Sequence, residues 1–185
     1  IATVAMDEAG TAVVQRATVQ PLDLAAAAGE KEALYQAQVK ALKTAIHSHG
    51  RLTGRIVLAL PRDSTTIRYI TLPSSHRDEL KEMLFLDAER HIPFPVDNVE
   101  IDFEVLEKLG EHESRIMMIS APRAEIEPLL DICHEAGVNP EAVDVDILGA
   151  CYAYMTNGET DETKAIIDFG RESTRLGIVS NNRVL

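Results

Sequence analysis

The sequence predicts a mixed α/β fold for one or two globular domains. Segments rich in β-branched residues alternate along the 185-residue chain with segments whose apolar residues recur at helical spacing. No internal repeat of roughly 20 to 50 residues is present, which argues against solenoids and propellers. No apolar stretch approaches the roughly 18 residues that a membrane-spanning helix needs, so we expect no direct membrane insertion.

The chain is expected to begin with a hairpin and a long helix. The runs IATVAM (1–6) and TAVVQRATVQ (11–20) flank DEAG, whose acidic residues and glycine favour a tight reversal. Leucine, isoleucine and alanine at helical spacing predict a helix over 30–49, and Gly50 follows as a stop.

Strands and helices then alternate to the end of the chain. In order, they are the strands GRIVLALP (54–61) and TTIRYITLP (65–73), a helix over 76–90, strands over 101–106 and 115–120, a helix closed by Gly137, the strand AVDVDI (142–147), the short helix LGACYAYM (148–155) and a hairpin over 165–179. We expect each consecutive strand pair to be joined within one sheet, covered on one face by the helices that follow. The hairpins at the two chain ends are expected to share another sheet.

Composition narrows the class of partner. Thirty acidic residues against 18 basic ones give a net charge of −12, which opposes a large footprint on nucleic acid or on an anionic membrane. Cys133 and Cys151 lack metal-site spacing, and the six histidines lack the pairing that zinc enzymes use. A reduced cytoplasmic protein that binds proteins or small ligands fits best.

The stretch AIIDFGRESTRLGIV (165–179) carries the most distinctive polar turn. Two apolar runs meet at Asp168, Gly170, Ser173 and Thr174, whereas an ordinary hairpin needs only Asn-Gly or Asp-Gly. Glycine lets the backbone approach a phosphate, hydroxyls donate to phosphate oxygens, and a carboxylate can hold hydrated magnesium. The alternative is a turn in which these residues have structural roles alone.

Three stretches resemble one family. DAERHIPFPVDNVEIDFEVLE (87–107), AVDVDILGACYAY (142–154) and AIIDFGRESTRLGIVSNNRVL (165–185) are similar, in the same order, to the PilM family of type IV pilus assembly proteins. These are actin-like proteins related to the cell-division protein FtsA. The helix that ends in Ile-Pro-Phe-Pro, followed by Asp-Phe-Glu-Val, is the most specific part.

The resemblance implies an actin-like ATPase fold, which is ribonuclease H-like, with an inserted α+β subdomain called 1C. On this basis 1–50 and 138–160 are expected to form part of subdomain 1A, 51–137 subdomain 1C, and 161–185 the start of domain 2. We expect the fold to be truncated at both ends, with a first phosphate loop before Ile1 and most of domain 2 after Leu185.

The resemblance also implies that the hairpin over 165–179 is the second phosphate loop. Asp168, Gly170 and Thr174 match its pattern Asp-x-Gly-x-x-x-Thr, with Ser173 as a further hydroxyl. ATP and magnesium, the latter held by Asp168 through water, are expected in the full-length parent and not in these 185 residues alone. No catalytic residue is identified, and the parent is expected to be at most a weak ATPase.

The segment RHIPFP (90–95) places Ile92 and Phe94 beside two prolines that stiffen the chain. One interpretation is that both side chains fill a core beneath the loop. The other is that they line a groove that binds a peptide by packing and strand addition. The resemblance favours the groove, since PilM-like proteins bind the cytoplasmic N-terminal tail of the inner-membrane protein PilN between 1A and 1C.

The function implied is a cytoplasmic, ATP-binding scaffold of type IV pilus assembly. It would lie at the inner membrane through a PilN-like partner and link that partner to motor components. Two alternatives remain open: the cytoplasmic actin-like domain of the type II secretion protein GspL, and a sugar-kinase-type phosphotransferase with the same second phosphate loop.

Overall fold

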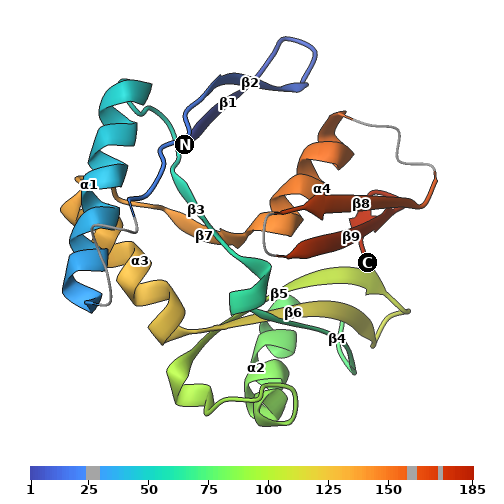
Figure 1. The fold of residues 1–185 in the computed structure, drawn as a ribbon. Coiled ribbons are helices and arrows are strands. Elements are labelled where there is room, and N and C mark those ends of the chain that lie inside the picture. Colours follow the sequence, from blue (N-terminus) through green and yellow to red (C-terminus); the bar gives the residue numbers. More distant parts are fainter. Residues whose placement is uncertain (24–29, 158–161, 171–172) are drawn as a thin grey trace. The chain divides into compact units, whose positions relative to one another are not determined.

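The computed structural model of the chain describes residues 1–23, 30–157, 162–170 and 173–185 (Figure 1). They form two compact units. One comprises Ile1–Ala59, Glu127–Asp144 and the described residues 156–157. The other comprises Leu60–Ile126, Val145–Met155 and the described residues that follow 159.

In the first unit a hairpin precedes a long helix. Strand β1 (Ala2–Met6) pairs antiparallel with β2 (Ala12–Ala17), and the Asp7 carboxylate accepts the N–H groups of Ala9 and Thr11 in the turn between them. Helix α1 (Lys31–His49) ends at Gly50, whose φ of 92° belongs to the left-handed region that favours glycine. The predicted hairpin and helix are therefore confirmed.

His49 joins the end of α1 to the hairpin. Its Nε2 lies 2.7 Å from Thr3 Oγ1 and its Nδ1 lies 2.8 Å from Thr18 Oγ1. The side chain is 3% exposed, so both threonine hydroxyls satisfy a buried ring that would otherwise lose its hydrogen bonds to water. The sequence analysis noted this histidine only as one without zinc-site spacing.

The first unit also contains β3 (Val57–Leu60), β7 (Ala142–Val145) and most of α3 (Arg123–Glu135), and β3 pairs with β7. Helix α1 contacts the end of α3 through Tyr35. A hydrogen bond to Glu135, followed by burial and nearby carboxylates, raises the pKa of Tyr35 to about 12.

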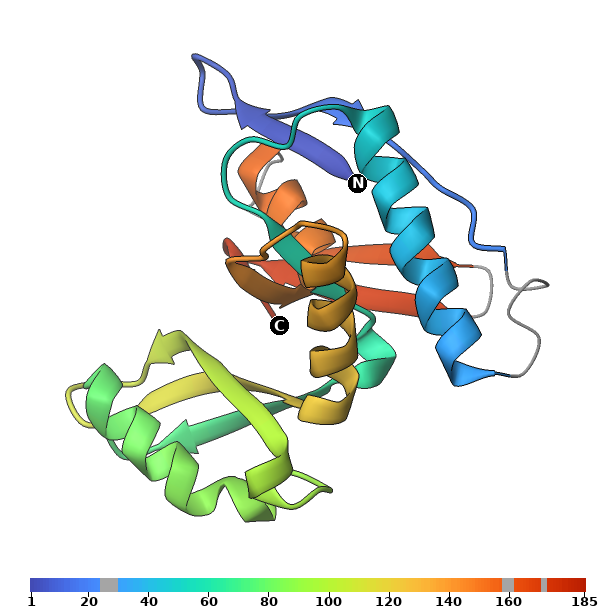
Figure 2. The same cartoon turned by 90° about the vertical axis from the view of Figure 1, so that its left-hand side faces the viewer.

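In the second unit, β4 (Thr66–Leu72), β6 (Ser114–Pro122) and β5 (Val99–Lys108) form an antiparallel sheet in the order β4-β6-β5. Helix α2 (Arg77–Asp87) continues into a 3-10 turn (Ala88–Arg90) and lies along one face, as Figure 2 shows. The core between helix and sheet consists of Ile70, Leu72, Leu80, Leu84, Ala88, Ile92, Val99, Phe103, Ile116 and Met118.

The opposite face of that sheet is covered as well. Because side chains alternate along a strand, Met117 and Ile119 point away from α2. They contribute to a second core with residues of α4 (Asp146–Asn157), β9 (Thr174–Ser180) and β10 (Arg183–Val184). The buried members of this core are Leu106, Met117, Val145, Ile147, Leu148, Cys151, Val179 and Val184.

Two expectations about strand partners and one about the covering of a sheet were wrong for the described strands. Strand β3 pairs with β7 and not with β4, and the β4-β6-β5 sheet is covered on both faces. The hairpin of β1 and β2 and the hairpin of β8 (Lys164–Phe169) and β9 belong to separate sheets. Alternating apolar residues predict a strand but not its neighbour, because pairing also depends on register and on the connecting segments. The subdomain boundaries 1–50, 51–137, 138–160 and 161–185 stay predictions.

Candidate functional site

The site is built on the hairpin of β8 (Lys164–Phe169) and β9. Its register pairs Asp168 with Arg175, and their face of the hairpin is the one packed on α4. The other face presents four exposed large apolar side chains among the described residues, namely Ile167, Phe169, Leu176 and Ile178. The polar pair therefore lies on the covered face of an apolar hairpin.

Gly170 closes the hairpin. Its N–H donates to the Ser173 carbonyl oxygen at 3.0 Å, and a Cβ added to Gly170 would lie 2.8 Å from that same oxygen. A side chain at this position would collide with backbone. The turn thus requires glycine for its own geometry, and the Gly170 N–H already has an acceptor in the Ser173 carbonyl oxygen.

Arg175 contacts three carboxylates. Its Nη1 lies 3.5 Å from Asp168 Oδ2, its Nε 3.3 Å from Asp146 Oδ2 and its Nη2 3.6 Å from Asp63 Oδ2. The contact with Asp146 is an ion pair that lacks hydrogen-bond geometry within the described residues. Because the Arg175 side chain is 18% exposed, water screens these contacts less than those of a surface ion pair.

Two of these carboxylates make further contacts. Asp146 Oδ1 accepts the N–H of Ile147 at 2.7 Å and that of Arg62 at 3.1 Å. Asp63, in the 3-10 turn η2 (Arg62–Ser64), accepts the Ser173 hydroxyl at 3.4 Å. The Arg175 cluster, defined as Asp63, Asp146, Asp168, Ser173 and Arg175, therefore joins the hairpin turn to the start of α4 and to η2.

Of the four residues predicted for the phosphate loop, Asp168 and Ser173 belong to this cluster. Gly170 lies between them in the turn, and Thr174 is exposed at the start of β9. The sequence pattern did not predict Asp63, Asp146 or Arg175 as members of the site. Counting the register outward from the turn would have paired Arg175 with Asp168, whereas Asp63 is distant in sequence and Asp146 was assigned to the strand 142–147.

The hydrogen-bond donors at the turn are of the types that bind phosphate. Ser173 and Thr174 offer hydroxyls, and Arg175 offers a guanidinium suited to phosphate oxygens. The three carboxylates exceed the single guanidinium in charge, so a bare phosphate would be repelled and a divalent cation would offset that repulsion.

The side chains at the turn define a magnesium site less completely than a phosphate site. Within the described ranges, no three His, Cys, Asp or Glu side chains are placed to hold a metal ion. Magnesium at phosphate sites is held by one or two carboxylates together with phosphate oxygens, and it keeps several waters. The half-exposed Asp168 fits that limited role.

The two residues predicted for partner binding lie in different environments. Ile92 is 7% exposed and is a member of the core between α2 and the sheet, so it packs as the first interpretation expected. Phe94 is 46% exposed and remains accessible to a partner. Burial argues against direct contact between Ile92 and a peptide, whereas partner binding by Phe94 stays a prediction.

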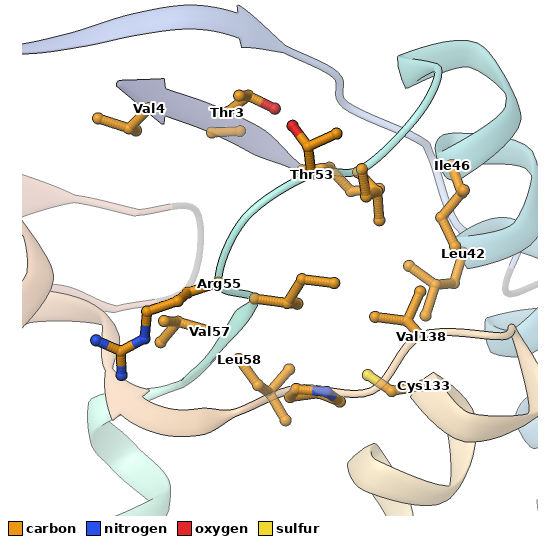
Figure 3. Close-up of a pocket in the computed structure, with 15 residues that line it drawn as sticks. Thr3, Val4, Leu42, Ile46, Thr53, Arg55, Val57, Leu58, Cys133 and Val138 are labelled. Atoms are coloured by element: carbon orange, nitrogen blue, oxygen red, sulfur yellow. The ribbon is translucent and has the colours of Figure 1, made fainter. Parts of the chain in front are cut away.

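The first unit contains an apolar pocket of about 240 Å³ (Figure 3). It lies among β1, α1, β3 and the end of α3, with Thr3, Leu42, Leu58 and Cys133 among its lining residues. Among the described residues that line it, Arg55 has the one charged side chain, and it is paired with Glu141 at 3.4 Å. The pocket is smaller than the roughly 300 to 1,000 Å³ usual for ligand sites and lacks converging phosphate donors, so it does not suit a nucleotide.

Comparison with known proteins identifies the family. The family model described as "Type IV pilus assembly protein PilM" matches residues 1–185. The chain belongs to the PilM family. The family predicted from the three sequence stretches is thereby confirmed, together with its link to type IV pili.

Two solved structures resemble this PilM-family chain. The "PilM-PilN type IV pilus biogenesis complex" matches with 24% identity and a TM-score of 0.73, over 100% of this chain and 55% of that chain. The cytoplasmic domain of EpsL, an inner membrane component of the type II secretion system of Vibrio cholerae, matches with 18% identity and a TM-score of 0.53, over 82% of this chain and 55% of that chain.

These matches confirm the predicted actin-like α/β fold. The PilM-family chain spans about half the length of the solved structures that it matches, 55% in both cases. No helix in the described part of the chain is long and apolar enough to cross a membrane.

Proposed function

We propose that the whole PilM-family protein is a cytoplasmic actin-like scaffold of type IV pilus assembly that binds the cytoplasmic N-terminal tail of a PilN-like inner-membrane protein. The match of the PilM family over residues 1–185 carries this proposal. The fold likeness to a PilM-PilN complex supports it, with a TM-score of 0.73. The tail would hold the scaffold at the inner membrane, and the scaffold would connect the partner to the motor components.

The whole protein would also bind ATP with magnesium. Ser173 and Thr174 would donate to phosphate oxygens, Arg175 would offset phosphate charge, and Asp168 would hold magnesium through water. The hairpin supports this proposal because these four side chains lie at or next to one turn that only glycine can close. Magnesium would supply the positive charge that the carboxylates of the Arg175 cluster require beside a phosphate.

The partner proposal can be tested in membranes. Membranes from cells that contain the inner-membrane partner should retain the whole protein, and membranes from cells whose partner lacks its cytoplasmic tail should release it. A matched strain in which the tail residues are scrambled at constant length and charge controls for partner abundance. Equal retention by the intact and tail-deleted partners would contradict the proposal.

A second candidate is a role in type II secretion, which the likeness to the EpsL cytoplasmic domain favours. That likeness covers less of the chain, 82% against 100%, and has the lower TM-score. Rescue of secretion, but not of piliation, in a strain that lacks the gene would favour this second candidate.

A further inference from the structure

The donors at the hairpin turn already have carboxylate acceptors. The Ser173 hydroxyl donates to Asp63 Oδ2, and the Arg175 guanidinium lies near that same oxygen. A phosphate oxygen would need both of these groups. Phosphate and carboxylate compete for hydroxyl and guanidinium donors because each presents negatively charged oxygens that accept hydrogen bonds.

The three carboxylates that contact Arg175 differ in how firmly other contacts hold them in place. Asp146 accepts two backbone N–H groups through its other oxygen, and Asp168 lies within a paired strand. Asp63 lies in the three-residue turn η2, and its side chain is 66% exposed. Asp63 therefore gives up its contacts with the hairpin at the lowest cost.

We propose that Asp63 occupies the position of a phosphate at the hairpin turn and that phosphate binding displaces it. This inference rests on the proposed nucleotide function of the hairpin, and it adds a residue outside the family's phosphate-loop pattern. Displacement frees η2 from the hairpin while Asp146 still holds the Arg62 N–H. Asp63 is thus a positioning residue that links phosphate occupancy to the turn between β3 and β4.

Calorimetry of the whole protein with Mg·ATP tests the competition. Asp63→Asn removes the competing charge, so the Kd should fall by about two- to fivefold, the range expected for a partly exposed ion pair. Asp97→Asn is the matched control, because it removes the same charge from the exposed turn η4 (Val96–Asn98) in the same unit. Equal affinities of the two variants would overturn the inference.

Amide hydrogen exchange gives a second readout that does not depend on affinity. In the wild type, Mg·ATP should speed exchange at Ser64 and Thr65, whose N–H groups donate to Pro61 and Arg62 within η2. In Asp63→Asn these amides should exchange fast with or without ligand. If the exchange rates of these amides in the wild type are the same with and without Mg·ATP, the inference is overturned.

The outcomes separate the two proposals. If the wild-type protein binds no Mg·ATP, both the nucleotide function and the role of Asp63 are overturned. If the wild type binds Mg·ATP but Asp63→Asn behaves like Asp97→Asn in either measurement, the nucleotide function stands and only the role of Asp63 is overturned.

Discussion

Gly170 and Gly149 are two glycines whose replacement by alanine should have opposite effects. At Gly170 a Cβ would lie 2.8 Å from the Ser173 carbonyl oxygen, so Gly170→Ala should destabilise the chain by about 1–3 kcal/mol. At Gly149, inside α4, a Cβ would meet nothing within 4 Å, so Gly149→Ala should stabilise it by roughly 0.5–1 kcal/mol. Chemical denaturation measures both. Equal changes in the two variants would contradict the tight turn at Gly170.

His49 should make stability depend on pH. Burial, followed by the charge of Arg16, lowers the pKa of His49 below its ordinary value of 6.5. The stability contributed by the neutral ring is therefore fully present above about pH 6.5 and is lost as the pH falls towards the lower pKa of the folded state.

Chemical denaturation at pH values from 7.5 down to about 5 tests this pH dependence of stability. This interval spans the ordinary pKa of histidine. The free energy of unfolding of the wild type should fall more steeply with acidification than that of His49→Gln. His112→Gln, which changes an exposed histidine in the turn between β5 and β6, should follow the wild type. A wild-type slope equal to that of His49→Gln would exclude His49 as the source.

The residue types at the hairpin turn were enough to predict a site there, but they were not enough to predict the tertiary contacts of that site. Asp168, Gly170, Ser173 and Thr174 stood out because an acid, a glycine and two hydroxyls interrupt two apolar runs. The acceptor of the Ser173 hydroxyl could not be predicted, because Asp63 lies 110 residues away. Local patterns report which side chains surround a turn, whereas distant partners depend on the tertiary fold.

At the scale of elements, β9 packs on α4 through Gly177. A Cβ at this position would lie 2.3 Å from Cys151 Sγ and 3.4 Å from Ile147 Cγ1. Gly177→Ala should therefore cost about 1–3 kcal/mol by overpacking. Cys151→Ala removes the sulfur, so the double variant should lose less stability than the sum of the two single variants. A purely additive cycle, measured by denaturation, would show that this contact does not limit the approach of β9 to α4.

The loop after α2 has one buried and one exposed apolar side chain, so substitutions at these two positions should have different effects. Ile92 is a core residue, so Ile92→Asp should destabilise the chain by about 3 kcal/mol or more because it buries an unpaired charge. Phe94 is exposed, so Phe94→Asp should change stability by roughly 1 kcal/mol or less. If Phe94 contacts the partner, Phe94→Asp should also weaken binding of the tail peptide to the whole protein at an unchanged melting temperature. Unfolding of Phe94→Asp would instead show that Phe94 belongs to the core.

Most element positions could be predicted from periodicity, and so could the neighbours β1–β2, β5–β6 and β8–β9, which are consecutive in sequence. Strand neighbours that are distant in sequence could not be predicted. The helix expected over 76–90 is α2 with its 3-10 extension, and the strands expected over 101–106 and 115–120 are β5 and β6. The pairing of β3 with β7 joins segments about 85 residues apart, a separation over which apolar alternation carries no information about partners.

At the scale of the whole molecule, the family was predicted from three ordered stretches, and the match over residues 1–185 confirms it. Composition alone predicted that the acidic net charge of −12 disfavours nucleic acid as a partner. The same charge favours a partner tail with basic residues beside its apolar positions.

We propose that the whole protein binds the cytoplasmic tail of an inner-membrane partner. Calorimetry with a synthetic peptide of that tail, and with a scrambled peptide of equal length and charge as the control, measures this binding. We expect saturable one-to-one binding with a Kd in the micromolar range or tighter, about −8 kcal/mol or stronger, for the native peptide alone. Equal heats from the native and scrambled peptides, at concentrations that saturate neither, would contradict it.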